Sequence, residues 1–308
     1  MKQDIWYYGV DDYIKCVYTH DPDNKLNSFE AILQDAPCDE SLSVNEAFMK
    51  SFRDYVPPKI ELLFSGGLDS EFILNLMLAN NLPVECITME LRLGDLLINT
   101  HDLYYSERLC REKGVKRRVV SLDATRFFEN GDHLRYLRPY RISIPHNATH
   151  LWLVEQCERF PVLSGDYHWG WNPNYRKVIS PQRHSISNYQ RFMNDNGITG
   201  ISNMIANSQE INFMCIKEHI ALLKNDTQGL YNDGIYLKKH VYEKISNQTY
   251  EPRLRSYGWE NIDASMFDRI HYRNQLLSEF GDNTLKISWG ENLAKVLDTT
   301  PGSNSDFK

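Results

Sequence analysis

The sequence predicts an α/β fold with a mainly parallel sheet covered by helices on both faces, followed by a helical C-terminal region. Two observations predict the sheet. Apolar runs typical of buried strands alternate with helical patterns through the first half of the chain, and glycines or prolines separate them. A third observation predicts the C-terminal region, because the alternation stops after Ser180-Pro181 and the remaining pattern is helical.

The N-terminal part precedes the alternating region and has its own pattern. Two aromatic runs, Ile5–Val10 and Tyr13–Thr19, predict a short hairpin. Ser43 and Glu46 have the spacing of a capping box, in which each side chain bonds the backbone N–H of the other residue. We therefore expect a helix that starts after Ser43 and is terminated by Pro57-Pro58.

The alternating region begins at residue 60, and prolines and glycines mark the ends of its helices. The expected strands are 60–64, 84–89, 118–122 and 161–164, and the expected helices are 69–81, 101–113 and 146–159. Ligands of such sheets bind beyond the carboxyl ends of the strands, where the loop at 65–70 lies.

The second half is expected to form a helical cap over that edge of the sheet. Its candidate helices are 207–224, 233–246 and 263–280, and the polar tail is expected to be disordered. The chain is thus divided into a strand-like extension at 1–44, an α/β domain at 45–180, a helical cap at 181–300 and a tail at 301–308.

Composition excludes several classes of protein. The chain has 308 residues and a formal net charge of -7, with both signs mixed along it, so an overall basic nucleic-acid surface is not indicated. No run approaches the roughly 20 apolar residues of a membrane span, and the N-terminus does not open a signal peptide, so we expect a cytoplasmic protein. The six cysteines are dispersed, which argues against disulfides and a zinc cluster.

The most informative motif is Ser-Gly-Gly-Leu-Asp-Ser at residues 65–70, between an expected strand and an expected helix. Its two glycines allow a sharp turn without a Cβ, and the following helix presents unpaired N–H groups and the positive end of its dipole. This arrangement predicts a phosphate site. The spacing matches neither a Walker loop nor the Gly-x-Gly-x-x-Gly of dinucleotide folds.

The motif resembles the pyrophosphate loop of the N-type ATP pyrophosphatases, which include asparagine synthetase, argininosuccinate synthetase and NAD synthetase. The resemblance implies a Rossmann-like, HUP-type nucleotide-binding fold, the cofactors ATP and Mg²⁺, and the products AMP and pyrophosphate. It also implies that Asp69 holds Mg²⁺ and acts in catalysis. The residues that would bind the phosphates are Ser65, Gly66, Gly67, Leu68, Asp69 and Ser70.

A second turn, Ser164-Gly165-Asp166, follows the expected strand 161–164. It resembles the Leu-Ser-Gly-Glu/Asp-Gly stretch of asparagine synthetase-type enzymes, which implies that Ser164 and Gly165 lie near the nucleotide and that Asp166 is a second metal carboxylate. The resemblance ends at Tyr167-His168-Trp169, where the family has small and acidic residues. These aromatic side chains could stack on a nucleobase or pack the cap onto the sheet.

The resemblance also indicates residues for adenine and for the leaving group. Thr88 and Met89 end the second strand and would contact adenine through their main chain, or belong to the core, or both. Lys238 and Lys239 are the preferred catalytic candidates to neutralise pyrophosphate. Any one such charge is more often a surface residue than a catalytic one. Further basic candidates are Arg176, Lys177, Arg183, Arg253 and Arg255.

The leading functional hypothesis is an ATP-dependent ligase of the asparagine synthetase-like type. It would adenylylate a carboxylate or carbonyl oxygen and let a nitrogen nucleophile displace AMP. Its partners would be small molecules, an acceptor and an amine or ammonia donor, because the glutaminase domain of asparagine synthetase is not found before the loop. Two alternatives stay open: a nucleobase- or nucleotide-modifying enzyme with the same activation step, and a sensor that binds ATP without cleaving it.

Overall fold

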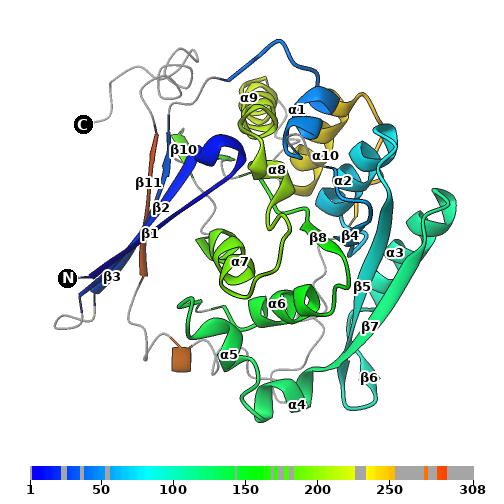
Figure 1. The fold of residues 1–308 in the computed structure, drawn as a ribbon. Coiled ribbons are helices and arrows are strands. Elements are labelled where there is room, and N and C mark those ends of the chain that lie inside the picture. The colour runs from blue at the N-terminus through cyan, green and yellow to red at the C-terminus, as the bar shows by residue number, and fades with distance from the viewer. Residues whose placement is uncertain are drawn as a thin grey trace.

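A computed structural model gives the fold of the chain, and its described parts are separated by short gaps. They are residues 2–21, 26–34, 38–52, 56–142, 144–167, 170–172, 177–179, 184–225, 234–253, 274–276 and 283–289. Within these ranges the chain forms a five-stranded sheet, a four-stranded sheet, a small two-stranded sheet and the helices that pack on them (Figure 1).

The five-stranded sheet is the centre of the α/β part. Its parallel strands lie in the order β7-β5-β4-β8, and a short strand, β6, pairs antiparallel with the end of β5. The bounds are β4 (Ile60–Leu63), β5 (Val84–Leu93), β6 (Leu96–Leu97), β7 (Arg117–Asp123) and β8 (Phe160–Leu163). Counted along the chain, the parallel strands therefore have the order 3-2-1-4, and the direction of winding reverses between β4 and β8.

Consecutive strand residues alternate between two hydrophobic cores, because side chains of a strand point to opposite faces. Leu62 and Val162 lie in the first core, whereas Leu63 and Leu163 contact the second. The predicted parallel sheet with helices on both faces is thus confirmed. The first core is built by α1 (Val44–Lys50), α2 (Leu68–Ala79), α3 (Thr100–Glu112), α8 (Met204–Asn207), α9 (Gln209–Lys224) and α10 (Gly234–Ser246). The second is built by α4 (Ala124–Glu129), α5 (Leu134–Leu137), α6 (Asn147–Glu155) and α7 (His184–Asp195).

The four-stranded sheet contains the predicted hairpin. Helices α7 and α8 lie between it and the central sheet (Figure 1). β1 (Lys2–Tyr8) and β2 (Ile14–Asp21) pair antiparallel with Ile5 opposite Val17, and a short 3₁₀ turn, η1 (Val10–Asp12), joins them. β3 (Leu26–Leu33) extends the sheet. The hydroxyl of Tyr13 donates to the carbonyl of Ala206 in α8, which ties the hairpin region to the helices.

A strand in the C-terminal half corrects the expectation that everything after residue 180 is helical. β11 (Asn283–Trp289) pairs in parallel with β3 and completes the four-stranded sheet. Its sequence alternates Leu285, Ile287 and Trp289 with polar residues, the period of a strand. The short strands β9 (Gly170–Asn172) and β10 (Lys177–Ile179) form another antiparallel pair.

Element boundaries otherwise follow the sequence patterns to within a few residues. The capping box is present, since Ser43 N–H donates to Glu46 Oε2 at 2.8 Å, but α1 ends at Lys50 rather than at the prolines. Helices α4, α5 and α7 were not expected. Most of the expected helix 263–280 and the tail lie outside the described residues. In the ranges given above, no helix has both the length and the apolar character needed to cross a bilayer.

Candidate active site

Both sequence motifs follow the two strands at which the winding reverses. The glycine loop comes directly after β4, and the Ser164-Gly165-Asp166 turn comes directly after the neighbouring β8. In open α/β sheets the carboxyl ends of the strands at this switch point form a crevice, and ligands bind there. The topology therefore brings together two segments that are about a hundred residues apart in the sequence.

The glycine loop makes a turn that a side chain at residue 66 would prevent. Gly66 has φ +75°, in the left-handed region. A Cβ on it would lie 2.5 Å from the backbone nitrogen of Ser106 and 2.7 Å from the carbonyl carbon of Tyr105, both in α3. The loop thus packs backbone against backbone on α3, which fixes its position relative to the sheet.

The remaining loop residues place the N-terminus of a helix at the carboxyl edge of the sheet. Gly67 is the N-cap of α2, and the helical pattern leaves the N–H groups of Leu68, Asp69 and Ser70 without a partner inside the helix. The exposed Ser65 hydroxyl accepts from Gly67 N–H at 3.3 Å, and so keeps its own proton for another acceptor. The buried Ser70 hydroxyl instead donates to the Gly67 carbonyl at 2.9 Å. These amides and the Ser65 hydroxyl are suited to an anion.

The second turn is held by one buried asparagine. Gly165 has φ +68°, and a Cβ on it would lie 1.9 Å from Asn203 Oδ1. That oxygen accepts from Asp166 N–H at 3.2 Å and from Ala206 N–H at 3.1 Å, while Asn203 Nδ2 donates to the Asp166 carbonyl at 3.2 Å. The Ser164 carbonyl accepts from an N–H of α8 at 3.0 Å. The backbone around Asp166 is therefore fixed on both sides.

One lysine brings the two turns together. Lys238 Nζ lies 2.9 and 3.0 Å from the two carboxylate oxygens of Asp69 and 3.0 Å from Asp166 Oδ1. The Tyr242 hydroxyl, from the next turn of α10, donates to Asp69 Oδ1. The ring of Tyr167 lies 5.8 Å from Lys238 Nζ. The carboxylates predicted to share a metal thus converge on one point, which a side-chain cation occupies.

Two side chains beside this cluster, Tyr242 and His219, are largely buried, and burial is the main influence on their protonation. Burial, then the charges of Asp69 and Asp166, raise the pKa of Tyr242 well above its usual value, so its hydroxyl remains a donor. Burial, with a smaller effect of Lys238, lowers the pKa of His219 to about 4. His219 Nδ1, 2.7 Å from the Tyr167 hydroxyl, therefore belongs to a neutral ring near pH 7.

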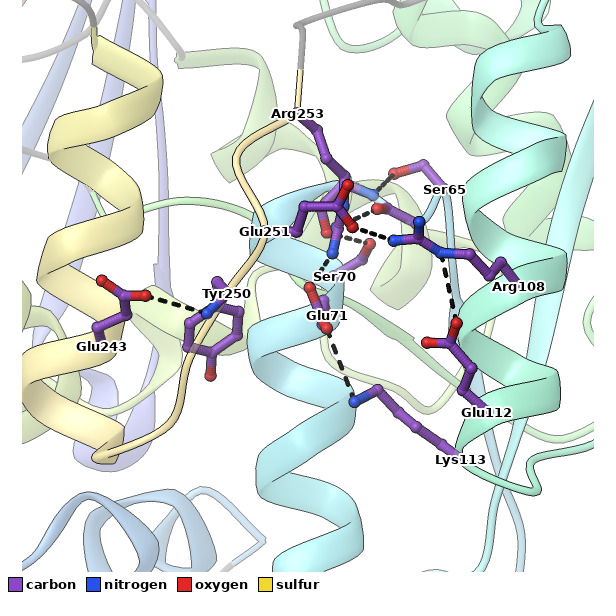
Figure 2. A network of polar contacts seen from close by, with 12 residues as sticks. Ser65, Ser70, Glu71, Arg108, Glu112, Lys113, Glu243, Tyr250, Glu251 and Arg253 are labelled. Atoms are coloured by element: carbon purple, nitrogen blue, oxygen red, sulfur yellow. Dashed lines mark hydrogen bonds and ion pairs between the residues drawn. The ribbon is translucent and has the colours of Figure 1, made fainter.

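Residues 250–253, which we call the strap, follow α10 and contact the glycine loop (Figure 2). The buried guanidinium of Arg253 donates to the Gly66 carbonyl and to Glu71 Oε2 in the first turn of α2. Lys113 Nζ lies 3.6 Å from the other Glu71 oxygen, and the Tyr105 ring centroid lies 5.1 Å from the guanidinium carbon of Arg253. The strap thus positions the loop through a buried ion pair.

Further contacts hold the strap in place at both ends. Arg108, from α3, donates to Glu251, and its Nε lies 3.6 Å from Glu112 (Figure 2). Glu243 Oε1 accepts from the Tyr250 N–H at 3.1 Å. Arg253 was a weak candidate for neutralising pyrophosphate. Its charge is instead paired with Glu71, so its contacts are those of a residue that positions the loop.

Helical spacing separates the two candidate lysines. Lys238 and Tyr242 lie one turn apart on the same side of α10, and both reach Asp69. Lys239 Nζ instead lies 2.8 Å from Glu243, the residue one turn further on its own side. Sequence reasoning missed Tyr242, although the i, i+4 rule applied to Lys238 would have indicated it. It also missed Asn203, whose signal was an N-cap residue before a short apolar helix.

The residues expected around adenine lie in the central sheet. The buried Thr88 hydroxyl donates to the Phe64 carbonyl at 2.8 Å, which connects β5 to the start of the glycine loop. The Met89 carbonyl accepts from Asn99 Nδ2 at 2.7 Å. A main-chain contact to adenine stays a prediction. Of the other candidates, His168, Trp169, Arg176, Arg183 and Arg255 lie outside the described residues, as does the side chain of Lys177.

The donor set fits Mg²⁺ bound together with a polyphosphate. Mg²⁺ usually takes one or two carboxylates from the protein and completes its shell with phosphate oxygens and water. Asp69 and Asp166 offer two carboxylates within about 3 Å of a common point, beside a helix N-terminus that suits phosphate. Across the described ranges, no group of three or more His, Cys, Asp or Glu side chains is arranged to hold a metal.

Comparison with known proteins gives structural neighbours only. No protein-family model matches the chain, and no curated protein does. Similar solved structures include an NMN synthetase from Francisella tularensis (10% identity, 80% of this chain and 99% of that chain, TM-score 0.35). An NH3-dependent NAD synthetase from Campylobacter jejuni is similar at 14% identity, covering 69% of this chain and 96% of that chain, with a TM-score of 0.30. A U34-tRNA thiolase from Methanococcus maripaludis is similar at 13% identity, covering 76% of this chain and 78% of that chain, with a TM-score of 0.31.

These neighbours are members of the ATP pyrophosphatase superfamily, the group that the glycine loop resembles. At TM-scores of 0.30 to 0.35 we derive neither the fold nor the reaction of this chain from them. The fold rests on the strand order and pairing given above, and the functional argument rests on the contacts around Asp69.

Proposed function

We propose that the chain is an ATP-dependent, AMP- and pyrophosphate-forming ligase that activates a carboxylate or carbonyl oxygen for attack by a nitrogen nucleophile. The observation that carries the proposal is the convergence of Asp69 and Asp166 on one cation position beside the N-terminus of α2. A site for a lone anion would not need two carboxylates. A site for a lone divalent cation would not need a helix N-terminus.

In this proposal, the chain's own groups would supply the binding contacts and the charge that the reaction needs. The N–H groups at the start of α2 and the Ser65 hydroxyl would bind the terminal phosphates and hold ATP in one orientation. Mg²⁺, when bound by Asp69 and Asp166, would supply positive charge to the phosphate oxygens. Lys238 would stabilise the charge that builds up on the pyrophosphate as its bond to the α-phosphorus breaks.

Positioning groups would keep this constellation fixed while bonds change. Tyr242 donates to Asp69, and Asn203 holds the backbone of Asp166 on both sides. Arg253 holds the Gly66 carbonyl, so the loop amides keep their direction. Fixed donors and charges of this kind need little reorganisation during the reaction, which is the main source of electrostatic catalysis.

The contacts of Tyr167 and the burial of the cysteines bear on the nucleobase-modifying enzyme, whereas they do not bear on the ATP sensor. Tyr167 is buried and lies 2.7 Å from His219 Nδ1, which favours packing over stacking on a nucleobase for this residue. A modifying enzyme that transfers sulfur would require accessible thiols, and Cys38 and Cys157 are half-buried. Cys86 and Cys110 contact each other, but both lie in the first core and are 1% and 3% exposed. The ATP sensor stays the alternative from another class, because it would use the same phosphate contacts without turnover.

The test is to follow the fate of the α-phosphate. The purified protein is incubated with α-labelled ATP, Mg²⁺ and a small-molecule extract, and AMP is separated from ADP. Asp69→Asn removes one metal carboxylate at almost unchanged volume. Asp132→Asn, at an exposed turn, is the matched control. We expect AMP that depends on the extract, disappears in Asp69→Asn and is unchanged in Asp132→Asn.

Other outcomes would refute or redirect the proposal. Production of ADP by the wild type, lost in Asp69→Asn, would show cleavage between the β- and γ-phosphates and would refute it. ATP binding that depends on Asp69, with no AMP in any fraction of the extract, would support the sensor. Stimulation of AMP release by nucleobases or nucleosides, but not by carboxylic acids, would favour the modifying enzyme.

A further inference from the structure

The cation position between Asp69 and Asp166 is already occupied by part of the protein. Lys238 Nζ lies within 3.0 Å of an oxygen from each carboxylate, and the lysine side chain is only 16% exposed. The Asp166 side chain is 9% exposed. The Asp69 side chain is half-buried, at 28% exposed. Two carboxylates this close together would be unfavourable without a cation, because like charges repel and the burial of Asp166 adds a desolvation cost. Lys238 therefore serves as the internal counter-ion of the pair.

The ammonium group and a metal ion cannot share this position. Mg²⁺ requires oxygen ligands at about 2.0–2.1 Å, so it would need the oxygens that now lie around Lys238 Nζ. Two positive charges a few ångströms apart would also repel each other strongly in a partly desolvated site. Lys238 must thus move away before a metal ion can bind to both carboxylates.

Without a nucleotide, displacement of Lys238 by Mg²⁺ is not favourable in free energy. Mg²⁺ loses its water reluctantly, and two carboxylates fill only part of its octahedral shell. ATP changes this balance because its phosphates supply further oxygen ligands. The same phosphates give the displaced ammonium group new acceptors beside the N-terminus of α2, which Asp69 adjoins.

Contacts other than those of Lys238 would hold the backbone of α10 in place during such a movement. Its helix, α10, stays tied to Asp69 through the Tyr242 hydroxyl, and Tyr242 stacks on Phe72 of α2 with ring centroids 4.3 Å apart. The lysine stem is flexible and carries a compact charge on four methylene groups. Only the end of the side chain would need to turn.

We propose that Lys238 is an exchangeable internal cation: it neutralises Asp69 and Asp166 until Mg²⁺ arrives with a polyphosphate, and then moves onto the phosphate oxygens. The proposal builds on the function proposed above, because it takes the same carboxylates as the metal ligands. It goes beyond that function in predicting that metal and nucleotide bind in a strongly interdependent way. Neither binds well alone, and each improves the binding of the other.

The test measures cation binding directly and needs no turnover. Mn²⁺ is titrated into the full-length protein, with free Mn²⁺ followed by electron paramagnetic resonance, in the absence and presence of a non-cleavable α,β-methylene ATP analogue. We compare the wild type with Lys238→Met, which keeps an apolar stem of similar length. Lys244→Met, an exposed lysine on the same helix, is the control. Circular dichroism checks that each variant is folded.

We expect the wild type and Lys244→Met to bind Mn²⁺ weakly alone and much more tightly with the analogue. Lys238→Met should bind Mn²⁺ alone more tightly than the wild type by roughly tenfold or more, because the competing charge is gone. Lys238→Arg, which keeps the charge, should show no such gain. Equal or weaker binding of Mn²⁺ alone by Lys238→Met would overturn the proposal, and so would an equal gain in Lys238→Arg.

The result can be separated from the fate of the proposed reaction. If the wild type releases no AMP with any extract but Lys238→Met gains Mn²⁺ affinity, the exchange is supported and the ligase is not. If AMP is formed in an Asp69-dependent reaction and the Mn²⁺ affinity does not change, the ligase is supported and the exchange is refuted. Should Lys238→Met fail to fold, Lys238→Gln is compared with Lys238→Arg by the same criterion.

Discussion

Replacing Arg253 by methionine tests whether the strap holds the glycine loop through a buried ion pair. Methionine keeps much of the apolar stem and removes the two donors that bond Gly66 and Glu71. The carboxylate of Glu71 then stays in the protein without its nearest cation. We expect a less stable protein, and a loop whose backbone is no longer tied to the C-terminal half.

The magnitude follows from burial and from the charge that remains. The side chains of Arg253 and Glu71 are 2% and 6% exposed, and removing one partner of a buried ion pair typically costs about 3–5 kcal/mol. Lys113 Nζ remains 3.6 Å from Glu71 and compensates in part. We therefore expect Arg253→Met to lower the free energy of unfolding by about 3 kcal/mol. The double variant with Glu71→Gln leaves no unpaired carboxylate and should lose only about 1 kcal/mol.

The assay is urea unfolding of the wild type, both single variants and the double variant, which together give a coupling free energy. Arg126→Met, which removes a surface pair with Asp123, is the control, and its effect should be below about 0.5 kcal/mol. The reasoning would be refuted if Arg253→Met changed stability as little as this control. It would also be refuted if the double variant lost the sum of the two single losses.

Two further predictions concern the loop and the polar contacts behind it. Gly66→Ala should lower the free energy of unfolding by about 3 kcal/mol, because the new Cβ would meet backbone atoms of α3 and the φ angle is unfavourable for alanine. Gly114 has φ +65° with open space around it, so Gly114→Ala should lower the free energy of unfolding by only about 1 kcal/mol. Urea unfolding measures both. Equal losses would contradict the packing described. The pKa of His219 is lowered to about 4 in the folded protein, whereas an unperturbed histidine has a pKa of about 6.5. As the pH falls below about 6.5, the unfolded chain is therefore protonated at His219 before the folded protein is, and the free energy of unfolding decreases until the pH reaches about 4. Between pH 7 and 5 this residue should cost about 2 kcal/mol, and His219→Gln should flatten the urea-midpoint profile in that range; an unchanged slope would show that His219 is not the group responsible.

Much of the central fold could be predicted because local signals agree with the global arrangement. The strands at 60–64 and 161–164 are short apolar runs that lead into glycine turns, and a parallel sheet needs buried strands of this kind. The capping box at Ser43 and Glu46 also acts within four residues. β11 was missed because its partner, β3, is distant in sequence, and an alternating run of seven residues carries little information by itself.

The candidate site shows the same division between local and distant signals. Asp69 and Asp166 could be named from their motifs, since each follows a strand that ends in a glycine turn. The choice between Lys238 and Lys239 depended on which side of α10 faces the carboxylates, and this follows only from packing. Tyr167 could be noted as an aromatic residue. Its hydrogen bond to His219, however, joins the segment that follows β8 to α9, and no local pattern relates these two parts of the chain.

The pairing of β3 with β11 has a consequence for how the protein is made. β3 leaves the ribosome early, whereas the strand that covers its outer edge is among the last parts of the described chain to be synthesised. During translation the N-terminal meander therefore has an open edge, which other strands can join. A truncation between residues 254 and 282 would leave that edge uncovered permanently. Expression of such fragments should favour aggregates over soluble protein, even though every residue of the glycine loop, Asp166 and the strap is still present.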